Sequence, residues 1–372
     1  MTLEQLLSEP VATARRREQT SFSGQTTDKL VLFGAGTLGR RVLAVLRRHG
    51  IEPLAFADRS PGLEESQVSG LQVLSPHAAA KHYGATATFI VTIFRGAGDG
   101  GMASRERLLR ELGCRKVMTF HNLAWKYAAD FLPYYGAALP SVILSAASEI
   151  ARVAAAWGDA ESREVFRAQL LWRLRGDFSA MKVQAPDQYF PKDLFGLTPN
   201  ESFVDGGAFD GDTLRILGNN FARAWAIEPD PANAARLRSA GDPRVTVFEC
   251  ALGAAAGEAT FSAERGVASA LSAVGGTRVT IETLDRLLSG QSPSLLKLDV
   301  EGAEQAALQG ARLLMERSQP TVAVCLYHRW DDLWKIPLFL KEVLPRHRLF
   351  LRAHENDGYE LVAYAVPPER CR

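Results

Sequence analysis

Two glycine-rich turns, each directly after a short apolar run, constrain the fold more than any other feature of this sequence. The first lies in KLVLFGAGTLG at residues 29–39, and the second in SFVDGGAFDGDT at residues 202–213. An apolar run that enters a glycine turn and leaves it as a helix is typical of the first strand of a parallel α/β domain, where nucleotides bind at the strand ends. We therefore expect two α/β domains, which 372 residues also favour.

The hydrophobic patterns predict the order of these domains. Residues 1–27 are expected to form a helical extension and linker, and residues 28–122 a small Rossmann-like domain. Residues 123–197 carry two amphipathic helical patterns, which could connect the domains, pair two copies of the chain or cover a site. In residues 198–372, five strands precede two runs joined by NDG at 356–358, an antiparallel signal. This order predicts the mixed seven-stranded sheet of a class I methyltransferase fold.

The second glycine turn favours a cationic nucleoside ligand over a diphosphate. Asp205 ends the apolar run, and Asp210 follows within the turn. Two carboxylates would repel a diphosphate at close range, but would attract the ammonium and sulfonium groups of S-adenosylmethionine (SAM). The residues that leave the backbone open to such a ligand, or begin the following helix, are Gly206, Gly207, Gly211 and Thr213.

The next two strands of this domain supply further candidates for a SAM site. Glu228 ends the second strand, where a carboxylate can accept hydrogen bonds from both ribose hydroxyls. The alternative for Glu228 is a helix cap. Cys250 and Ala251 end the third strand and are expected to flank the adenine. Cys250 is interpreted as a packed small side chain rather than a nucleophile.

Several motifs in this half of the chain resemble the FkbM family of SAM-dependent methyltransferases. They are FVDGGAFDGDT, AIEPDP, ALG, VTIETLD, LLKLDVEGAEQAALQGA and YHRWDDLWKIPLFL. The resemblance covers about residues 185–366, and LKLDVEGAE is its most specific piece. It implies SAM as the cofactor and O-methylation of a sugar or another hydroxyl on a glycan, lipid or natural product. Many members end the fifth strand in a glutamate, whereas this chain has CLYHRWDDLWKIP.

Three polar residues at strand ends are the candidates for catalysis. Asp299 ends the fourth strand, Glu301 begins the next helix, and His328 ends the fifth strand, so we expect them to lie close together. His328 or Asp299 could act as the general base, or the three could hold a divalent cation that polarises the acceptor hydroxyl. The alternative for the two carboxylates is capping of the following helix. We assign no metal site, because local ligand spacing is absent from the sequence.

The stretch HRWDDLWKIP is a candidate for substrate binding. Trp330 and Trp334 offer aromatic faces, and Asp331 offers a hydrogen-bond acceptor, a combination that suits a carbohydrate. Packing of both tryptophans into the core is an equal alternative. His354 is a further candidate contact of the acceptor.

The first glycine turn matches the dinucleotide pattern. Gly34, Gly36 and Gly39 give G-x-G-x-x-G between a strand and a helix, and Asp58 ends the next strand. An NAD(P)- or nucleotide-sugar-dependent oxidoreductase is therefore the alternative function. The domain is short and no hydride-transfer group stands out elsewhere, so we favour an accessory role, with or without a nucleotide. A non-catalytic glycan-binding protein is the third alternative.

Charge and composition limit the partners. The net charge of +1 does not indicate a nucleic-acid partner or an acidic membrane surface. The sequence has no apolar run long enough to span a bilayer, and its first residues do not resemble a secretory signal. The four cysteines are far apart, as expected in the cytoplasm. The expected partner is a small-molecule or glycan acceptor, and homo-oligomerisation stays open.

Overall fold

The chain divides into two compact units. The computed structural model describes residues 1–372 except 26, 64–65, 95–99, 184–186, 263–269 and 273–276. Unit 1 comprises Met1–Ser148, Val165–Lys182 and Glu355–Tyr359. Unit 2 comprises Glu149–Glu164, Val183–His354 and Glu360–Arg372.

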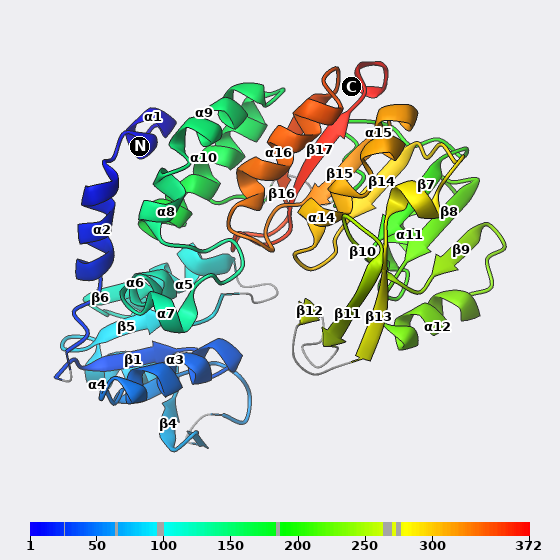
Figure 1. Ribbon diagram of the computed structural model, residues 1–372. Helices are drawn as coiled ribbons and strands as arrows, with labels where there is room; N and C mark the ends of the chain where they lie inside the picture. Colours follow the sequence, from blue (N-terminus) through cyan, green and yellow to red (C-terminus); the bar gives the residue numbers. More distant parts are fainter. Residues whose placement is uncertain (26, 64–65, 95–99, 184–186, 263–269, 273–276) are drawn as a thin grey trace. The chain divides into compact units, whose positions relative to one another are not determined.

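Unit 1 contains a six-stranded sheet in the order β3-β4-β2-β1-β5-β6 (Figure 1). The strands are β1 (Leu30–Phe33), β2 (Ala55–Ala57), β3 (Gln67–Val68), β4 (Leu71–Leu74), β5 (Thr88–Val91) and β6 (Lys116–Thr119). Its helices are α1 (Leu3–Leu7), α2 (Val11–Thr20), α3 (Thr37–Arg48), α4 (Pro76–Tyr83), α5 (Gly101–Glu111), α6 (Phe120–Lys126), α7 (Ala128–Phe131) and α8 (Pro140–Leu144). Neighbouring strands are parallel except β3 and β4, so the predicted Rossmann-like arrangement is confirmed, with β3 as an unpredicted addition.

Unit 2 contains a seven-stranded sheet in the order β16-β17-β15-β14-β7-β8-β9 (Figure 1). The strands are β7 (Ser202–Gly206), β8 (Arg223–Ile227), β9 (Val245–Phe248), β14 (Leu295–Leu298), β15 (Thr321–Cys325), β16 (Arg348–Ala353) and β17 (Leu361–Val366). Strand β17 lies antiparallel between β15 and β16, whereas the other pairs are parallel. The mixed seven-stranded sheet of the class I methyltransferase fold is therefore confirmed.

A second, smaller sheet in unit 2 was not predicted. Its order is β10-β13-β11-β12, with β10 (Ala251–Leu252), β11 (Gly257–Ser262), β12 (Ala270–Ser272) and β13 (Thr277–Glu282). The helices of the unit are α11 (Asp212–Leu217), α12 (Pro231–Ser239), α13 (Leu284–Leu287), α14 (Glu304–Gln309), α15 (Arg312–Ser318) and α16 (Asp332–Val343), with a 3₁₀ turn at Pro368–Arg370. Two of its strands, β10 and β12, have only two and three residues, which is too few for a hydrophobic pattern to reveal them.

The two units divide the chain differently from the predicted boundaries. The predicted connector at residues 123–197 is shared between the units, with α9 (Ala147–Ala156) and α10 (Ala160–Arg175) crossing the division. Within unit 1, Arg175 forms an ion pair with Glu9 at 2.9 Å, so the predicted N-terminal extension also packs there. Within unit 2, Asp159 forms an ion pair with Arg352 of β16 at 2.8 Å. These contacts join segments that are far apart in the sequence, which linear patterning does not show.

One close approach brings the strand ends of unit 2 together. Gly207, which follows β7, has a φ of +77°, and a Cβ atom there would overlap the carbonyl oxygen of Asp299, which follows β14. Only glycine tolerates both conditions, so this residue lets the β7 turn lie directly against the end of β14.

None of the helices in the described part of the chain has the length and apolar character needed to cross a bilayer.

Candidate functional site

A cavity in unit 2 lies over the ends of β7, β8 and β14. Several predicted site residues line it, namely Gly207, Thr213, Glu228, Cys250, Ala251, Asp299 and Glu301. Tyr189 and Lys297 also line it, although the sequence analysis did not select them. The cavity therefore gathers residues from both the predicted SAM site and the predicted catalytic group.

Among the described residues that line this cavity, most of the charged ones are acidic. Its carboxylates belong to Asp212, Glu228, Asp230, Asp299 and Glu301. Lys297 is the only cationic residue among the described residues that line the cavity. Such a wall attracts a cationic ligand and repels a diphosphate.

The charge of Lys297 is neutralised within the protein. Its Nζ lies 3.0 Å from Oδ1 of Asp205 and donates a hydrogen bond to the carbonyl oxygen of Gly207 at 2.6 Å. The side chains of Lys297 and Asp205 are 3% and 0% exposed. Burial acts to raise the pKa of Asp205, although the ammonium group of Lys297 partly opposes this effect.

The structure therefore corrects the expected role of Asp205. Its side chain is fully buried and is not among the residues that line the cavity, so it does not present its carboxylate to a ligand. The buried ion pair instead fixes the position of Lys297. The Lys297 ammonium group in turn donates a hydrogen bond to the Gly207 carbonyl oxygen. The sequence places Asp205 at the correct strand end, but it does not show that Lys297 lies opposite.

Glu228 is held by the backbone at the cavity wall. Its Oε2 accepts a hydrogen bond from the Phe209 backbone N–H at 2.8 Å, and its Oε1 accepts one from the Asp230 N–H at 2.9 Å. Burial raises the pKa of Glu228, although these two hydrogen bonds oppose the rise. Asp230, and not Glu228, caps α12, because it accepts from the N–H groups of Ala232 and Asn233. The helix-cap alternative for Glu228 is therefore not supported.

The remaining predicted SAM-site residues differ in their surroundings. Cys250 is buried, and burial together with Glu282 raises the pKa of its thiol to about 11, so it stays protonated at neutral pH. A Cβ on Gly206 would press on Leu298. Asp210 forms an ion pair with Arg215 at 2.7 Å, and Gly211 begins α11 with a φ of +87°. Gly206, Asp210 and Gly211 are not among the cavity-lining residues.

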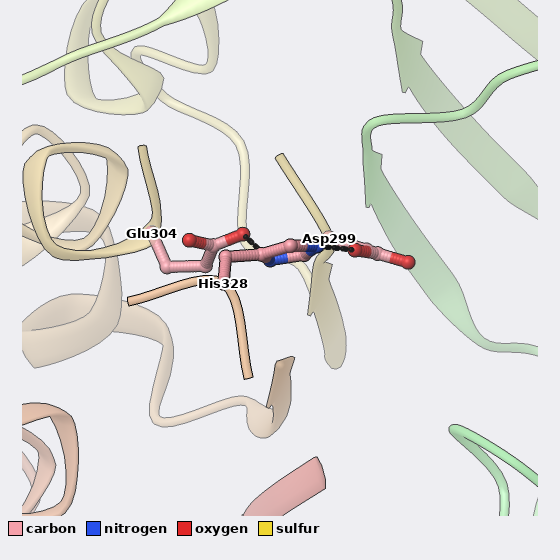
Figure 2. A group of neighbouring side chains, drawn as sticks. All are labelled: Asp299, Glu304 and His328. Carbon is pink, nitrogen blue, oxygen red and sulfur yellow. Dashed lines mark hydrogen bonds and ion pairs between the residues drawn. The ribbon is translucent and has the colours of Figure 1, made fainter. Parts of the chain in front are cut away.

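The predicted catalytic residues Asp299 and Glu301 both lie near the imidazole ring of His328. Figure 2 shows the ring between Asp299 and Glu304. Its Nε2 lies 3.5 Å from Oδ1 of Asp299 and 3.4 Å from Oε2 of Glu301. Its Nδ1 lies 2.8 Å from Oε1 of Glu304, on the opposite side of the ring from Asp299. The Glu304 oxygen also accepts hydrogen bonds from the backbone N–H groups of Val300 at 2.9 Å and Gly302 at 3.3 Å.

These carboxylates determine the protonation of His328. Burial acts to lower the pKa of the imidazole, but Glu304, Asp299 and Glu301 outweigh it and raise the pKa to about 10. An imidazolium cannot accept a further proton, so this arrangement argues against His328 as the general base. Burial acts to raise the pKa of Asp299, but His328 and Lys297 outweigh it and the pKa lies below its ordinary value. Asp299 is therefore ionised and able to accept a proton.

The charge on His328 predicts a pH-dependent contribution to stability. A histidine whose pKa is raised from 6.5 to about 10 contributes stability that is complete below about pH 6.5 and is lost as the pH rises through about 10. In buffer with EDTA, the difference in unfolding free energy between the wild type and His328→Gln should therefore shrink from about pH 7 to about pH 10. Urea denaturation at each pH measures it. A constant difference would contradict an imidazolium at neutral pH.

The predicted substrate residues do not line the cavity. Trp334 is 1% exposed and packs in the core, so it is not available to a substrate. Its ring contacts that of Trp330 edge-on, with the centroids 5.4 Å apart. Asp331 is buried and forms an ion pair with Lys335 at 2.6 Å. Nε2 of His354 lies 2.9 Å from the hydroxyl oxygen of Tyr364. The core-packing alternative is thus correct for Trp334.

Sequence reasoning missed the residues that surround Asp299. The hydroxyl of Tyr189 donates a hydrogen bond to Oδ2 of Asp299 at 2.7 Å, and that of Tyr327 lies 3.5 Å from Oδ1. Burial raises the pKa of both phenols well above the ordinary value, so both remain protonated donors. One signal was available, because Lys297 interrupts the apolar run LLKLDV and a lysine there must be buried and paired.

Unit 1 contains a second cavity at the first glycine turn. Gly34, Gly36 and Asp58 line it, together with Arg40 and Arg59. The carboxylate of Asp58 accepts hydrogen bonds from the backbone N–H groups of Ala35 and Ser60, both at 2.7 Å. A Cβ on Gly39, the remaining predicted residue, would overlap the Gly34 carbonyl, whereas one on Gly36 would meet no atom within 4 Å. Gly34 and Gly39 thus have no room for a side chain, whereas Gly36 faces open space.

Comparison with known proteins finds similarities for the second half of the chain and for its overall fold. Residues 205–361 match the family model described as the methyltransferase FkbM domain. The whole chain is similar to the crystal structure of methyltransferase FkbM from Methylobacillus flagellatus KT, with a TM-score of 0.75 and 21% identity over 98% of this chain and 96% of that one. At this identity the likeness shows the fold, which includes both units.

Two other similar structures each match about half of the chain. An rRNA methylase from Streptococcus thermophilus matches 46% of this chain and 89% of its own, with a TM-score of 0.30 and 10% identity. A protein from Streptococcus mutans, solved in complex with S-adenosylhomocysteine (SAH), matches 45% of this chain and 90% of its own, with a TM-score of 0.31 and 12% identity. These scores are too low to bear on the fold or the ligand. None of the curated proteins matches the sequence.

Proposed function

We propose that this chain, whose residues 205–361 match the model of the methyltransferase FkbM domain, is a SAM-dependent methyltransferase that methylates a hydroxyl oxygen of a sugar, a glycan or a natural product. The observation that carries this proposal is the acidic cavity of unit 2. It joins Glu228 at one strand end with Asp299 and Glu301 at another. An acidic wall suits a ligand that carries an ammonium and a sulfonium group.

The residues present fit SAM at the nucleoside end of the cavity. Both oxygens of Glu228 are oriented by backbone N–H groups, and each keeps a lone pair for a ribose hydroxyl. Cys250 and Ala251 form a small, largely apolar wall where the adenine is expected. When bound, SAM supplies a methyl group that is already activated by the sulfonium, so the main task of the protein is to align the acceptor.

Asp299 is proposed to receive the proton of the acceptor hydroxyl. It is ionised, lies at the cavity wall and has a side chain that is 22% exposed, so an acceptor can reach it. Tyr189 fixes its Oδ2 through a hydrogen bond at 2.7 Å. A carboxylate flanked by phenol hydroxyls suits a polyhydroxylated acceptor, whose other hydroxyls need hydrogen-bond partners. This arrangement supports O-methylation of a carbohydrate-like molecule.

Calorimetry tests the SAM site. SAH is expected to bind the full-length chain, and Glu228→Ala is expected to weaken it by about 30- to 100-fold, because two hydrogen bonds to a charged group are lost. Glu258→Gln changes an exposed carboxylate of the same unit and should leave the affinity unchanged. Binding of NAD without binding of SAH would overturn the proposal.

Mass spectrometry tests the reaction. The chain is incubated with SAM that carries a labelled methyl group and with an extract of glycans and natural products, and the label is expected on an oxygen of an extract component. Label on nitrogen or carbon would refute O-methylation, and no transfer despite SAH binding would favour the glycan-binding alternative.

The second cavity supports an accessory role for unit 1. Arg40 and Arg59 beside Gly36 suit an anionic ligand such as a nucleotide or a nucleotide-sugar. An oxidoreductase that uses NAD(P) remains the alternative for this unit, and titration with NAD in the same calorimeter tests it. The four cysteines are free thiols, which is consistent with the proposed cytoplasmic location.

A further inference from the structure

We propose that Asp299, Glu301 and His328 bind one divalent cation at the reacting end of the unit 2 cavity, and that Glu304 positions the histidine for it. The cation would lie between Nε2 of His328 and the two facing carboxylate oxygens. The site is a property of these side chains, and only its role in catalysis rests on the proposed function.

The distances around Nε2 fit a shared ion better than direct hydrogen bonds. Charge-assisted N–H···O bonds measure about 2.7–2.9 Å. Nε2 lies 3.5 Å from Oδ1 of Asp299 and 3.4 Å from Oε2 of Glu301, which is too long for such bonds. Ligand atoms about 2.1 Å from one metal ion, at angles of about 90–110°, lie about 3.0–3.4 Å from each other. The two separations from Nε2 lie at and just above the upper end of this range, so a small movement would bring the three atoms onto one ion.

The Nε2 atom is also buried without a hydrogen-bond partner. The His328 side chain is 3% exposed, and Nε2 has no hydrogen bond to any part of the chain that the structure describes. Burial of a ring nitrogen without a hydrogen bond raises the free energy of the folded protein unless another group interacts with that nitrogen. A cation held jointly with Asp299 and Glu301 would satisfy it, and its binding would displace the Nε2 proton of the imidazolium into solvent.

Glu304 acts from the far side of the ring. Its Oε1 lies 2.8 Å from Nδ1, while Asp299 faces Nε2 on the other side (Figure 2). A carboxylate on the outer nitrogen fixes the ring orientation and makes the inner nitrogen a stronger donor to a metal. Glu304 is 0% exposed and is itself held by the backbone N–H groups of Val300 and Gly302. It is therefore a positioning residue rather than a ligand.

Glu301 lies near His328 in a backbone conformation that is energetically unfavourable. Glu301 has a φ of +53°, a region that L-residues with side chains rarely adopt. Such conformations persist where the surroundings impose them, often at ligand sites. The adjacent Gly302, with a φ of +99°, continues the turn. This turn places Oε2 of Glu301 3.4 Å from Nε2 of His328, to which Asp299 also lies close.

Two carboxylates and one imidazole suit an ion of intermediate hardness. Carboxylates favour magnesium and manganese, and imidazole favours zinc and other transition metals. Mn²⁺ satisfies both kinds of ligand, and its paramagnetism makes it a direct probe. Asp299 and Glu301 line the cavity, so an acceptor hydroxyl could reach the ion.

Binding of Mn²⁺ alone tests the site. The full-length chain is freed of metal with EDTA, which is then removed, and free Mn²⁺ is followed by electron paramagnetic resonance. One ion is expected per chain. Glu301→Gln and His328→Gln are expected to weaken its binding at least tenfold, and Glu304→Gln by about 10–100-fold. Glu316→Gln, which changes an exposed carboxylate of α15, should bind as the wild type does.

The outcomes separate this inference from the proposed function. SAH affinity in each variant shows that unit 2 has folded. Failure of the wild type to bind Mn²⁺, or equal binding by the wild type, Glu301→Gln and His328→Gln, would overturn the site. Methyl transfer that persists in EDTA would overturn the catalytic role of the cation but leave the proposed function intact. Mn²⁺ binding without any methyl transfer would leave the site and remove the function.

Discussion

Replacing Lys297 with methionine is expected to lower the free energy of unfolding of unit 2 by about 3–5 kcal/mol. The ammonium group is 3% exposed and pairs with a carboxylate of Asp205 that is 0% exposed. Methionine keeps most of the volume but removes the charge, so it leaves Asp205 as a buried carboxylate without compensation. Loss of the hydrogen bond to the Gly207 carbonyl adds to the effect.

Hydrogen exchange of peptides from β7 and β14, measured against urea concentration, reports the stability of unit 2 separately from that of unit 1. The double variant Asp205→Asn/Lys297→Met should recover part of the loss, because it removes both charges. Lys192→Met is the matched control, since Lys192 is 80% exposed and its ion pair with Asp187 is expected to contribute at most about 1 kcal/mol. Equal stabilities of Lys297→Met and the wild type would show that the buried pair does not stabilise unit 2.

The sheet of unit 2 could be predicted because its signals are local. Each parallel strand is a short apolar run that ends in a turn, and NDG at residues 356–358 indicates the antiparallel step between β16 and β17. The order of the strands follows from these signals once the fold class is known. The small sheet of β10 to β13 has a weaker signal, because two of its strands, β10 and β12, have only two and three residues.

The candidate site was only partly predictable, because its chemistry depends on contacts between distant segments. The rule that strand ends share one edge places Asp299 near His328. It does not show that Glu304 lies on the far side of the ring, although that contact helps to raise the pKa of His328. Nor does it show that Lys297 forms a buried ion pair with Asp205. Both corrections concern the partner of a charged group, which a linear sequence does not reveal.

Changing Asp299 to asparagine is expected to lower kcat for methyl transfer by about 10²–10⁴-fold, the range for loss of a general base. Asparagine has nearly the same shape and can still accept the hydrogen bond from Tyr189, but it cannot take a proton. SAH affinity should change by less than about threefold, because the loss concerns the reacting end and not the nucleoside end. Transfer of labelled methyl from SAM to the extract fraction that supports turnover measures kcat.

The same variant distinguishes the two roles that the structure gives Asp299. If Asp299 acts mainly as a cation ligand, excess Mn²⁺ should restore much of the turnover of Asp299→Asn, because an amide oxygen can still coordinate a metal weakly. If Asp299 takes the proton, saturation with Mn²⁺ leaves kcat low, since no amide replaces a base. Glu316→Gln, on exposed α15, should keep full turnover throughout. Turnover of Asp299→Asn in EDTA that stays within tenfold of the turnover of the wild type with Mn²⁺ would exclude both roles, and the acceptor proton would then have to leave directly to water.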